Sequence, residues 1–305
     1  MKLIVIINRE AGAAAQASGD FSPKALAGEF ASRGIEVDVR AVAPEAIETA
    51  VREAVGLHPT AVVIGGGDGT VRSAAALLSN TGMTLGVLPL GTLNHFAKDL
   101  RMPSAWRDAV AALAWGVVRE VDVAEVNGHV FVNNCSLGAY AEAVRRRDAL
   151  RRQRGHGKWL AMAQAALAVF RRLRRLRLRI VVAGVERHVR TPLVVVANNR
   201  YSGHVLDVSM RGRLDEGRLW LYTAHVHRHL PVLRLVWQTL TRHRPDAADA
   251  LDSEPAREIT IESEAGRPVP VAADGELLAI ETPLVFRIRA RALRVLAPPE
   301  ASVKK

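Results

Sequence analysis

The sequence contains very little cysteine and few aromatic residues. Cys135 is the only cysteine among 305 residues, and Phe, Trp and Tyr together make up 5%. A single cysteine excludes a disulfide within the chain and fits a reducing compartment. The shortage of aromatics, with no helix-turn-helix, zinc-finger or RNA-binding signature, argues against nucleic acid as a partner.

The sequence also lacks long apolar segments. No uninterrupted apolar run reaches the roughly 18–20 residues that a membrane-spanning helix needs. The apolar residues 3–7 are too short for a signal peptide and lead directly into Asn8-Arg9-Glu10. We therefore expect a cytoplasmic protein, with any membrane contact peripheral and at the inner face.

Positive charge is in excess, with a formal net charge of +11. Much of it lies in the region Arg145-Arg179, and such an excess calls for an anionic partner. Within this region, residues 156–176 have apolar side chains at helical spacing between flanking arginines, which is typical of helices at an anionic bilayer surface. A helix that packs on its own domain with a solvated charged end has the same periodicity, so both interpretations stay open.

Strand and helix patterns alternate over the first 120 residues, which predicts an open, Rossmann-like α/β domain. After residue 120 short strands follow one another with turns between them, which predicts a β-sandwich. The strands expected there are residues 121–126, 129–133, 180–189, 192–197, 218–224, 258–262, 269–272 and 283–296. Helical spacing also covers residues 230–243, and residues 246–253 have the composition of a polar loop.

The strongest local signal is a glycine turn at Gly65-Gly66-Gly67-Asp68-Gly69-Thr70. An apolar run precedes it and a helical pattern follows, so it predicts a buried strand, a tight turn and a helix N-terminus. Glycines let the backbone approach an anion, and a helix start offers unpaired N–H groups to phosphate. We interpret it as a nucleotide-phosphate site. A turn that merely packs tightly is the alternative, and the Gly-Lys-Ser/Thr ending of a Walker A loop is absent.

A second glycine turn, Gly91-Thr92-Leu93-Asn94-His95-Phe96-Ala97, follows the next predicted strand. If the two strands are neighbours in a parallel sheet, both turns lie at one crevice and surround it with hydroxyl and N–H groups. Such a crevice could hold a polyphosphate.

Acidic turns and alternating histidines mark the second half of the chain. Asp274-Gly275-Glu276 is either a solvated hairpin tip or a catalytic pair, because Asp-Gly is a strong hairpin signal. The turn Arg213–Leu219 has carboxylate and carbonyl oxygens that could hold a hard cation. His225, His227 and His229 would share one face of a strand and could bind zinc, or form a polar strand end.

Together these motifs resemble the diacylglycerol kinase catalytic-domain family, especially the soluble bacterial lipid kinases, which are related to sphingosine and ceramide kinases. The resemblance runs nearly end to end. It rests on both glycine turns, Asp122, Asn133–Gly138, Asp215–Leu219 and Asp274-Gly275-Glu276. It implies a nucleotide-binding domain at residues 1–122, to which a strand at about 285–297 returns, a β-sandwich lipid-substrate domain at 123–284, and a nucleotide in the cleft between them.

The resemblance also implies an ATP- and Mg²⁺-dependent transfer of phosphate to a lipid hydroxyl, and a role for each matching residue. Glu276, seconded by Asp274, would accept the hydroxyl proton, and Asp68 would lie near the metal-bound phosphate. The expected nucleotide-binding residues are Asn8, Gly65, Gly66, Gly67, Asp68, Gly69, Thr70, Gly91, Thr92 and Asn94. The expected metal ligands are Glu216 with the carbonyls of Arg213 and Arg218, and Asp122 in a metal–water network.

Three positions depart from the family pattern. The first loop, Asn8-Arg9-Glu10-Ala11-Gly12, keeps the asparagine and the glycine but has no proline. His95 stands where many relatives have Asp, which removes a carboxylate that would accompany Asp122. Glu216 stands at a metal position usually held by Asp.

The expected partners are a lipid substrate and an anionic membrane surface contacted by Arg145-Arg179, with a homodimer left open. One alternative is a soluble NAD or sugar kinase, which shares the first glycine turn. Another is a nucleotide-binding regulator at the membrane surface that has lost catalysis.

Overall fold

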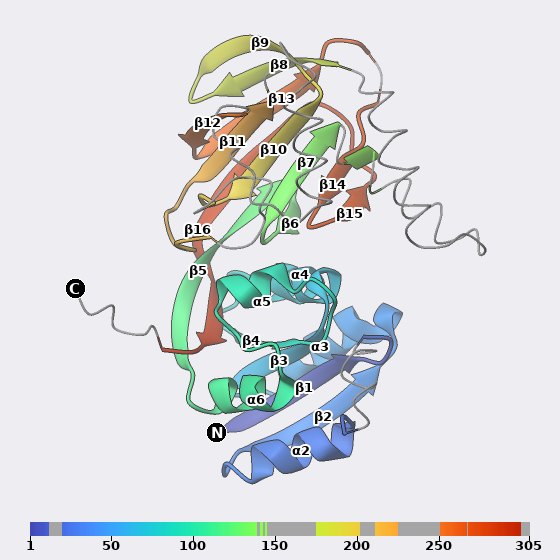
Figure 1. Ribbon diagram of the computed structural model, residues 1–305, viewed down its shortest axis with the longest axis vertical. Helices are drawn as coiled ribbons and strands as arrows, with labels where there is room; N and C mark the ends of the chain where they lie inside the picture. Colours follow the sequence, from blue (N-terminus) through green and yellow to red (C-terminus); the bar gives the residue numbers. More distant parts are fainter. Residues whose placement is uncertain are drawn as a thin grey trace, which may run out of the picture. The chain divides into compact units, whose positions relative to one another are not determined.

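The computed structural model describes residues 1–11, 20–138, 141, 142, 144, 175–201, 211–224, 251–266 and 268–299. The chain divides into two compact units (Figure 1). The first comprises Met1–Val123 and the stretch from Arg289 onward, and the second comprises Ala124–Ile288. Strands β5 (Val117–Val126) and β16 (Leu284–Ala297) each pass from one unit to the other.

The N-terminal unit is built on a parallel sheet in the strand order β2-β1-β3-β4-β16. Its other strands are β1 (Lys2–Asn8), β2 (Glu36–Val42), β3 (Ala61–Gly66) and β4 (Thr84–Pro89). The helices are α2 (Pro23–Ala31), the short 3-10 turn η1 (Pro44–Ala46), α3 (Ile47–Gly56), α4 (Asp68–Leu78), α5 (His95–Asp99) and α6 (Trp106–Ala114). Helices α2 and α6 lie together on one face, and α3 and α4 on the other (Figure 1).

Burial on both faces explains why β1, β3 and β4 are almost wholly apolar. All six residues of β3 and of β4 are buried, as a sheet covered by helices on both sides requires. Local sequence explains where helix α2 begins, because Ser22 accepts a hydrogen bond from the Ala25 N–H at 3.0 Å and Pro23 occupies the first turn. The Rossmann-like fold predicted for this part of the chain is confirmed.

The C-terminal unit is antiparallel and contains strands of two sheets. One has the order β16-β13-β8-β9, and the other β12-β11-β10-β7-β14-β15. The strands are β6 (His129–Phe131), β7 (Asn134–Gly138), β8 (Leu176–Val182), β9 (Val185–Thr191), β10 (Leu193–Asn198), β11 (Leu219–Ala224), β12 (Leu251–Ala256), β13 (Glu258–Ser263), β14 (Val271–Ala273) and β15 (Glu276–Leu278). Side chains from both sheets form one core, including Leu137, Ile180 and Phe286, so the predicted β-sandwich is confirmed.

Three strand predictions in this unit are wrong in detail. Residues 180–189 form a hairpin, β8–β9, because Ala183 and Gly184 turn the chain with φ of 49° and 82°. The expected strand 129–133 ends at Phe131, and β7 starts separately at Asn134. The expected polar loop 246–253 overlaps β12, an edge strand, where a polar sequence and a proline are tolerated.

Several expectations lie outside the described residues. They are most of the Arg145-Arg179 region, the helical stretches 156–176 and 230–243, the histidines His225, His227 and His229, and Gly12. Within the described ranges, no helix combines the length and hydropathy needed to cross a membrane.

Cys135 lies in the sandwich core and gives a prediction on reactivity and alkaline stability. Burial raises the pKa of its thiol far above the ordinary value, and the nearby Asp274 charge adds to the rise. We therefore expect no reaction with a thiol reagent in the native protein and full reaction in urea. Above about pH 9 the Cys135 thiol ionises only in the unfolded chain. The free energy of unfolding of the wild-type protein should therefore fall by about 1.4 kcal/mol per pH unit relative to that of Cys135→Ala. Parallel pH slopes for the two proteins in urea titrations would contradict this.

Candidate active site

The first glycine turn joins strand β3 to helix α4. The strand ends at Gly66, and Gly67 takes the N-cap position with φ −91° and ψ −176°. Gly67 has no side chain that could cap the helix. The first backbone hydrogen bond of α4 runs from the Val71 N–H to the Gly67 carbonyl at 3.1 Å. The N–H groups of Asp68, Gly69 and Thr70 belong to the first turn, where an α-helix leaves donors without helical partners.

The two glycine turns meet because β3 and β4 are neighbouring parallel strands. A Cβ atom at Gly91 would lie 2.4 Å from the Gly67 Cα, which no folded backbone accommodates without a shift. A Cβ atom at Gly66 would lie 2.7 Å from the Thr70 Cβ, and one at Gly65 would lie 3.1 Å from Leu90 Cδ1. Glycine is therefore required at these positions because the two turns pack closely. The absence of side chains there allows the two backbones to approach each other.

Asn8 joins the same group from the end of β1. Its side-chain amide donates to Thr70 Oγ1 at 3.2 Å, and its Oδ1 accepts a hydrogen bond from the Glu10 N–H at 3.0 Å. The structure thus brings three predicted nucleotide-binding segments together in the N-terminal unit, at the carboxyl ends of β1, β3 and β4.

Asn94 shapes the second turn. It adopts the left-handed region with φ 52° and ψ 45°, and its side chain both accepts from the Gly91 N–H at 2.9 Å and donates to the Gly91 carbonyl at 2.8 Å. Asp68 links this turn to the first by accepting from the Phe96 N–H at 3.4 Å. Thr92 lies exposed on the same turn. The Nδ1 atom of His95 is buried, and among the described residues it has no hydrogen-bond partner.

Asp122 lies on β5 and is almost fully buried, with 1% of its surface exposed. Its carboxylate accepts a hydrogen bond from the Arg291 N–H at 2.7 Å, where β16 bends with an Arg291 φ of 52°. This contact fixes two neighbouring strands of the N-terminal unit to each other. The predicted role of Asp122 in a metal–water network stays a prediction.

The acidic motif of the C-terminal unit is a two-residue hairpin turn between β14 and β15. Asp274 and Gly275 have φ of 48° and 80°, the left-handed pair that such turns require. Glu276 follows and is exposed. A hairpin turn at this motif does not exclude a catalytic role. The turn leaves Glu276 exposed, while the Asp274 carboxylate is bonded within the protein.

Asp274 holds the chain between β6 and β7. Its carboxylate accepts three backbone N–H bonds, from Val132 and Asn133 at 2.8 Å each and from Asn134 at 3.1 Å. Hydrogen bonds of this kind fix the orientation of the carboxylate. Asp274 is therefore a positioning residue for the hairpin that carries Glu276.

We expect Asp274→Asn to destabilise the protein by about 2 kcal/mol, because an amide has one acceptor oxygen and no charge for three N–H donors. The free energy of unfolding in urea measures this. Glu281→Gln, at an exposed position of the same unit, is the matched control and should leave the unfolding midpoint unchanged. Equal midpoints for Asp274→Asn and the wild type would contradict the anchoring role.

Sequence reasoning missed Arg211, which supports the same segment from its other side. Its guanidinium is buried and donates to the carbonyls of Val132 at 2.6 Å and Asn198 at 2.7 Å, and to Asn133 Oδ1 at 3.1 Å. The neighbouring sequence gives no sign that this arginine is interior. A sequence signal for buried polar contacts was available in the Asn198-Asn199 pair, which lies at the end of the buried strand β10 and includes one of the carbonyls that Arg211 contacts.

The predicted structural-metal turn has its carboxylates engaged within the protein. Glu216 accepts from the Trp220 indole N–H at 3.0 Å and from the Arg200 N–H at 3.4 Å, and Asp215 pairs with Arg213 at 3.0 Å. The Arg218 carbonyl accepts from the Asn199 N–H at 3.1 Å. Among the residues described, no three His, Cys, Asp or Glu side chains gather as a metal site. A metal here stays a prediction.

These features define a class of two-unit proteins, with a glycine-lined turn pair on a parallel α/β sheet and an acidic hairpin on an antiparallel sandwich. The diacylglycerol kinase catalytic domain matches residues 2–126, and the YegS C-terminal NAD kinase beta sandwich-like domain matches residues 133–297. The chain belongs to the family of diacylglycerol kinase catalytic-domain proteins with this YegS-type C-terminal domain.

Similar proteins agree with this assignment. A "Probable lipid kinase YegS-like" of Pectobacterium atrosepticum is 28% identical over 62% of this chain and 64% of its own length. One of Chromohalobacter salexigens is 29% identical over 70% and 69%. The matched part thus spans about two thirds of these relatives. A crystal structure of a diacylglycerol kinase from Bacillus anthracis str. Sterne shares the fold, with a TM-score of 0.68, 18% identity, and coverage of 98% of this chain and 97% of that one.

Proposed function

We propose that this protein is an ATP- and Mg²⁺-dependent lipid kinase, which transfers the γ-phosphate to the hydroxyl of a diacylglycerol-like or other long-chain lipid. The observation that carries the proposal is the close approach of Gly67 and Gly91 on adjacent strands, in a chain that belongs to the diacylglycerol kinase catalytic-domain family. The relatives' names, which read lipid kinase, support a lipid acceptor.

The residues of the N-terminal unit suit the phosphates of ATP. The first turn of α4 offers backbone N–H groups and the positive end of an eleven-residue helix. Glycine at positions 66 and 91 lets the two turns pack closely, which keeps their backbone N–H groups at one end of the sheet. Asn8 and Thr70 add an amide and a hydroxyl to the same end of the sheet.

The donor set also suits Mg²⁺ shared with the nucleotide. Kinase sites usually hold Mg²⁺ by one or two carboxylates together with substrate phosphates, not by an all-protein cage. Asp68, at the start of α4, can supply such a carboxylate beside the bound phosphates. When bound, the ion neutralises charge on the phosphate oxygens during transfer.

Glu276 is the proposed proton acceptor for the lipid hydroxyl. Its carboxylate is exposed on a hairpin that Asp274 fixes in place through three backbone hydrogen bonds. Phosphoryl transfer depends mainly on positioning and charge stabilisation, so one oriented carboxylate within hydrogen-bond reach of the acceptor completes the chemistry.

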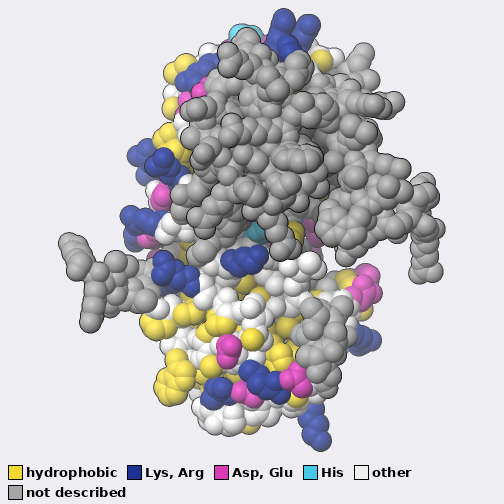
Figure 2. Space-filling view, in the orientation of Figure 1, with side chains coloured by type: hydrophobic (Ala, Val, Ile, Leu, Met, Phe, Trp, Pro, Cys, Tyr) yellow, Lys and Arg dark blue, Asp and Glu magenta, His cyan; other side chains and the backbone are white. Residues whose placement is uncertain are grey.

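The remaining proposals concern where the protein works. A lipid substrate requires access to a bilayer, and the basic region Arg145-Arg179 would contact the anionic inner face from the cytoplasm. On the face in Figure 2, Lys and Arg along the described edge of the C-terminal unit alternate with Asp and Glu. At Arg179, for example, Glu186 and Glu262 both form ion pairs. The surplus charge for membrane binding would therefore come from residues 145–174. A homodimer is compatible with this proposal.

A transfer assay tests the proposal. Purified protein receives ATP labelled in the γ-phosphate, Mg²⁺, and mixed micelles containing diacylglycerol, monoacylglycerol, sphingosine, ceramide or phosphatidylglycerol, with NAD and fructose 6-phosphate as soluble acceptors. Label in a lipid supports the proposal and names the substrate. Label only in NAD or the sugar would establish a soluble kinase instead, and ATP binding without any transfer would favour a regulator.

A further inference from the structure

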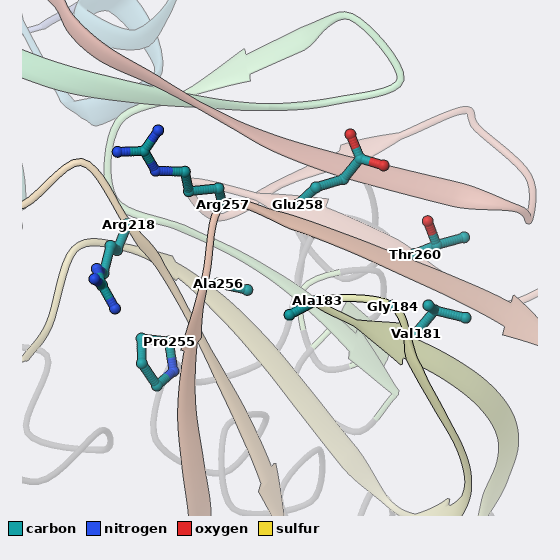
Figure 3. Close-up of a pocket in the computed structure, with 9 residues that line it drawn as sticks. All are labelled: Val181, Ala183, Gly184, Arg218, Pro255, Ala256, Arg257, Glu258 and Thr260. Atoms are coloured by element: carbon teal, nitrogen blue, oxygen red, sulfur yellow. The ribbon is translucent and has the colours of Figure 1, made fainter.

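A pocket of the C-terminal unit lies apart from the acidic hairpin. It has a volume of about 460 Å³, within the range of small-ligand sites. The chain passes from β12 to β13 at its wall, and the β8–β9 turn at Ala183-Gly184 closes another side (Figure 3). In the six-stranded sheet, β12 and β11 are at one edge and β15, which begins with Glu276, is at the other.

Two arginines line this pocket together. Leu219 on β11 and Ala256 on β12 form the last pair of their antiparallel ladder, and Arg218 and Arg257 each follow one residue beyond it. Both side chains lie on the same side of the pocket, away from Glu258 and Thr260 (Figure 3). If the ladder is continued by one residue, the two arginines are opposite each other, and like charges in that arrangement are mildly unfavourable, which a bound anion would relieve.

The carboxylates closest in sequence to the two arginines are engaged with other groups. Glu216 accepts hydrogen bonds from the Trp220 indole N–H and the Arg200 N–H. Glu258 pairs with Arg287 at 2.8 Å, which raises the pKa of that guanidinium. Glu254 pairs with Arg187 at 2.9 Å, and Asp215 with Arg213. Within the part of the chain that the structure describes, the guanidinium groups of Arg218 and Arg257 form no hydrogen bond or ion pair. The pocket therefore has an uncompensated charge of about two on one side.

We propose that this pocket binds a phosphate-bearing anion, held by Arg218 and Arg257. A guanidinium matches phosphate oxygens in geometry and charge, and two of them can neutralise a phosphate ester. Val181, Ala183, Pro255 and Ala256 give the pocket an apolar wall for the carbon part of such an ester. A phospholipid headgroup and a soluble phosphate ester share this chemistry. The pocket shares no residue with the proposed nucleotide turns or with Glu276, and does not depend on the kinase proposal.

The test is calorimetric titration with inorganic phosphate and with glycerol 3-phosphate at low ionic strength. A saturating non-hydrolysable ATP analogue suppresses binding at the glycine turns. The variant is Arg218→Gln with Arg257→Gln. Its control, Arg33→Gln with Arg40→Gln, loses the same charge from arginines paired with Glu29 and Asp38 in the N-terminal unit. Because the first variant removes like-charge repulsion, its unfolding midpoint should be no lower than that of the wild type.

We expect the pocket variant to raise the dissociation constant at least tenfold and the control to change it less than twofold. Equal affinities for wild type and pocket variant, or an equal loss in the control, would overturn the proposal. Vesicles of phosphatidylcholine containing phosphatidylglycerol then identify the source. If the pocket variant alone stops co-sedimenting with them, the ligand is a lipid headgroup. If it still co-sediments while phosphate binding is lost, the ligand is a soluble phosphate.

Discussion

Glu276→Gln is expected to lower the rate of phosphate transfer to lipid by about 10²- to 10⁴-fold, the contribution typical of an oriented general base. The amide cannot accept the hydroxyl proton. The hairpin is fixed by Asp274, which the substitution leaves in place. The dissociation constant for ATP should therefore stay within about twofold, because a residue outside the glycine turns carries no share of phosphate binding.

The matched control is Glu281→Gln, an equal change of charge at another exposed glutamate of the same unit. It should transfer phosphate at the wild-type rate. Steady-state rates in mixed micelles and ATP titrations measure the two effects separately. Normal transfer by Glu276→Gln would remove Glu276 from its assigned role, and a parallel loss of ATP binding would mean that the substitution acts through the fold.

Gly91→Ala is expected to destabilise the protein by about 2–3 kcal/mol and to weaken ATP binding at least tenfold. The added Cβ would lie 2.4 Å from the Gly67 Cα and 2.7 Å from Asn94 Oδ1, so the two turns must separate. The φ of Gly91 lies outside the left-handed region, so the cost comes from this contact and not from backbone strain.

Gly67→Ala provides the control within the same pair of turns. Its Cβ would meet the Gly91 Cα at 3.5 Å, an ordinary van der Waals distance, so we expect a loss of stability of about 1 kcal/mol or less. Urea unfolding of both variants tests the contact, and ATP titration of Gly91→Ala measures the loss of binding. Equal stability of the two variants would show that the turns are not packed as the structure has them.

The N-terminal unit could be predicted from sequence because its signals are local. Apolar strands buried on both faces, the Ser22 cap and the glycine turns each follow from a few consecutive residues. The predicted turn residues Asn8, Thr70 and Asn94 are indeed brought to one end of the sheet. What the sequence does not reveal is that Asn94 bonds to its own turn, because this depends on a left-handed φ of 52°.

The C-terminal unit was harder to predict because its turns and buried polar contacts are not local. The β8–β9 hairpin was not predicted because its turn has alanine, Ala183, in the left-handed conformation, where Asn or Asp is usual. Arg211 and Asp274 both contact residues 132–134, which lie at least 78 residues away from either of them in the chain. A carboxylate that serves three backbone N–H groups is indistinguishable in sequence from a solvated hairpin tip.

The most direct test of the kinase assignment uses a total-lipid extract of bacterial membranes, so that no acceptor is chosen in advance. The extract is incubated with the purified protein, Mg²⁺ and ATP carrying ¹⁸O in the γ-phosphate, and lipids that gain the labelled phosphoryl group are identified by mass spectrometry. We expect at least one hydroxyl-bearing lipid to gain it with the wild type, and at a rate at least 100-fold lower with Glu276→Gln. No labelled lipid from wild-type protein that binds ATP would contradict the assignment.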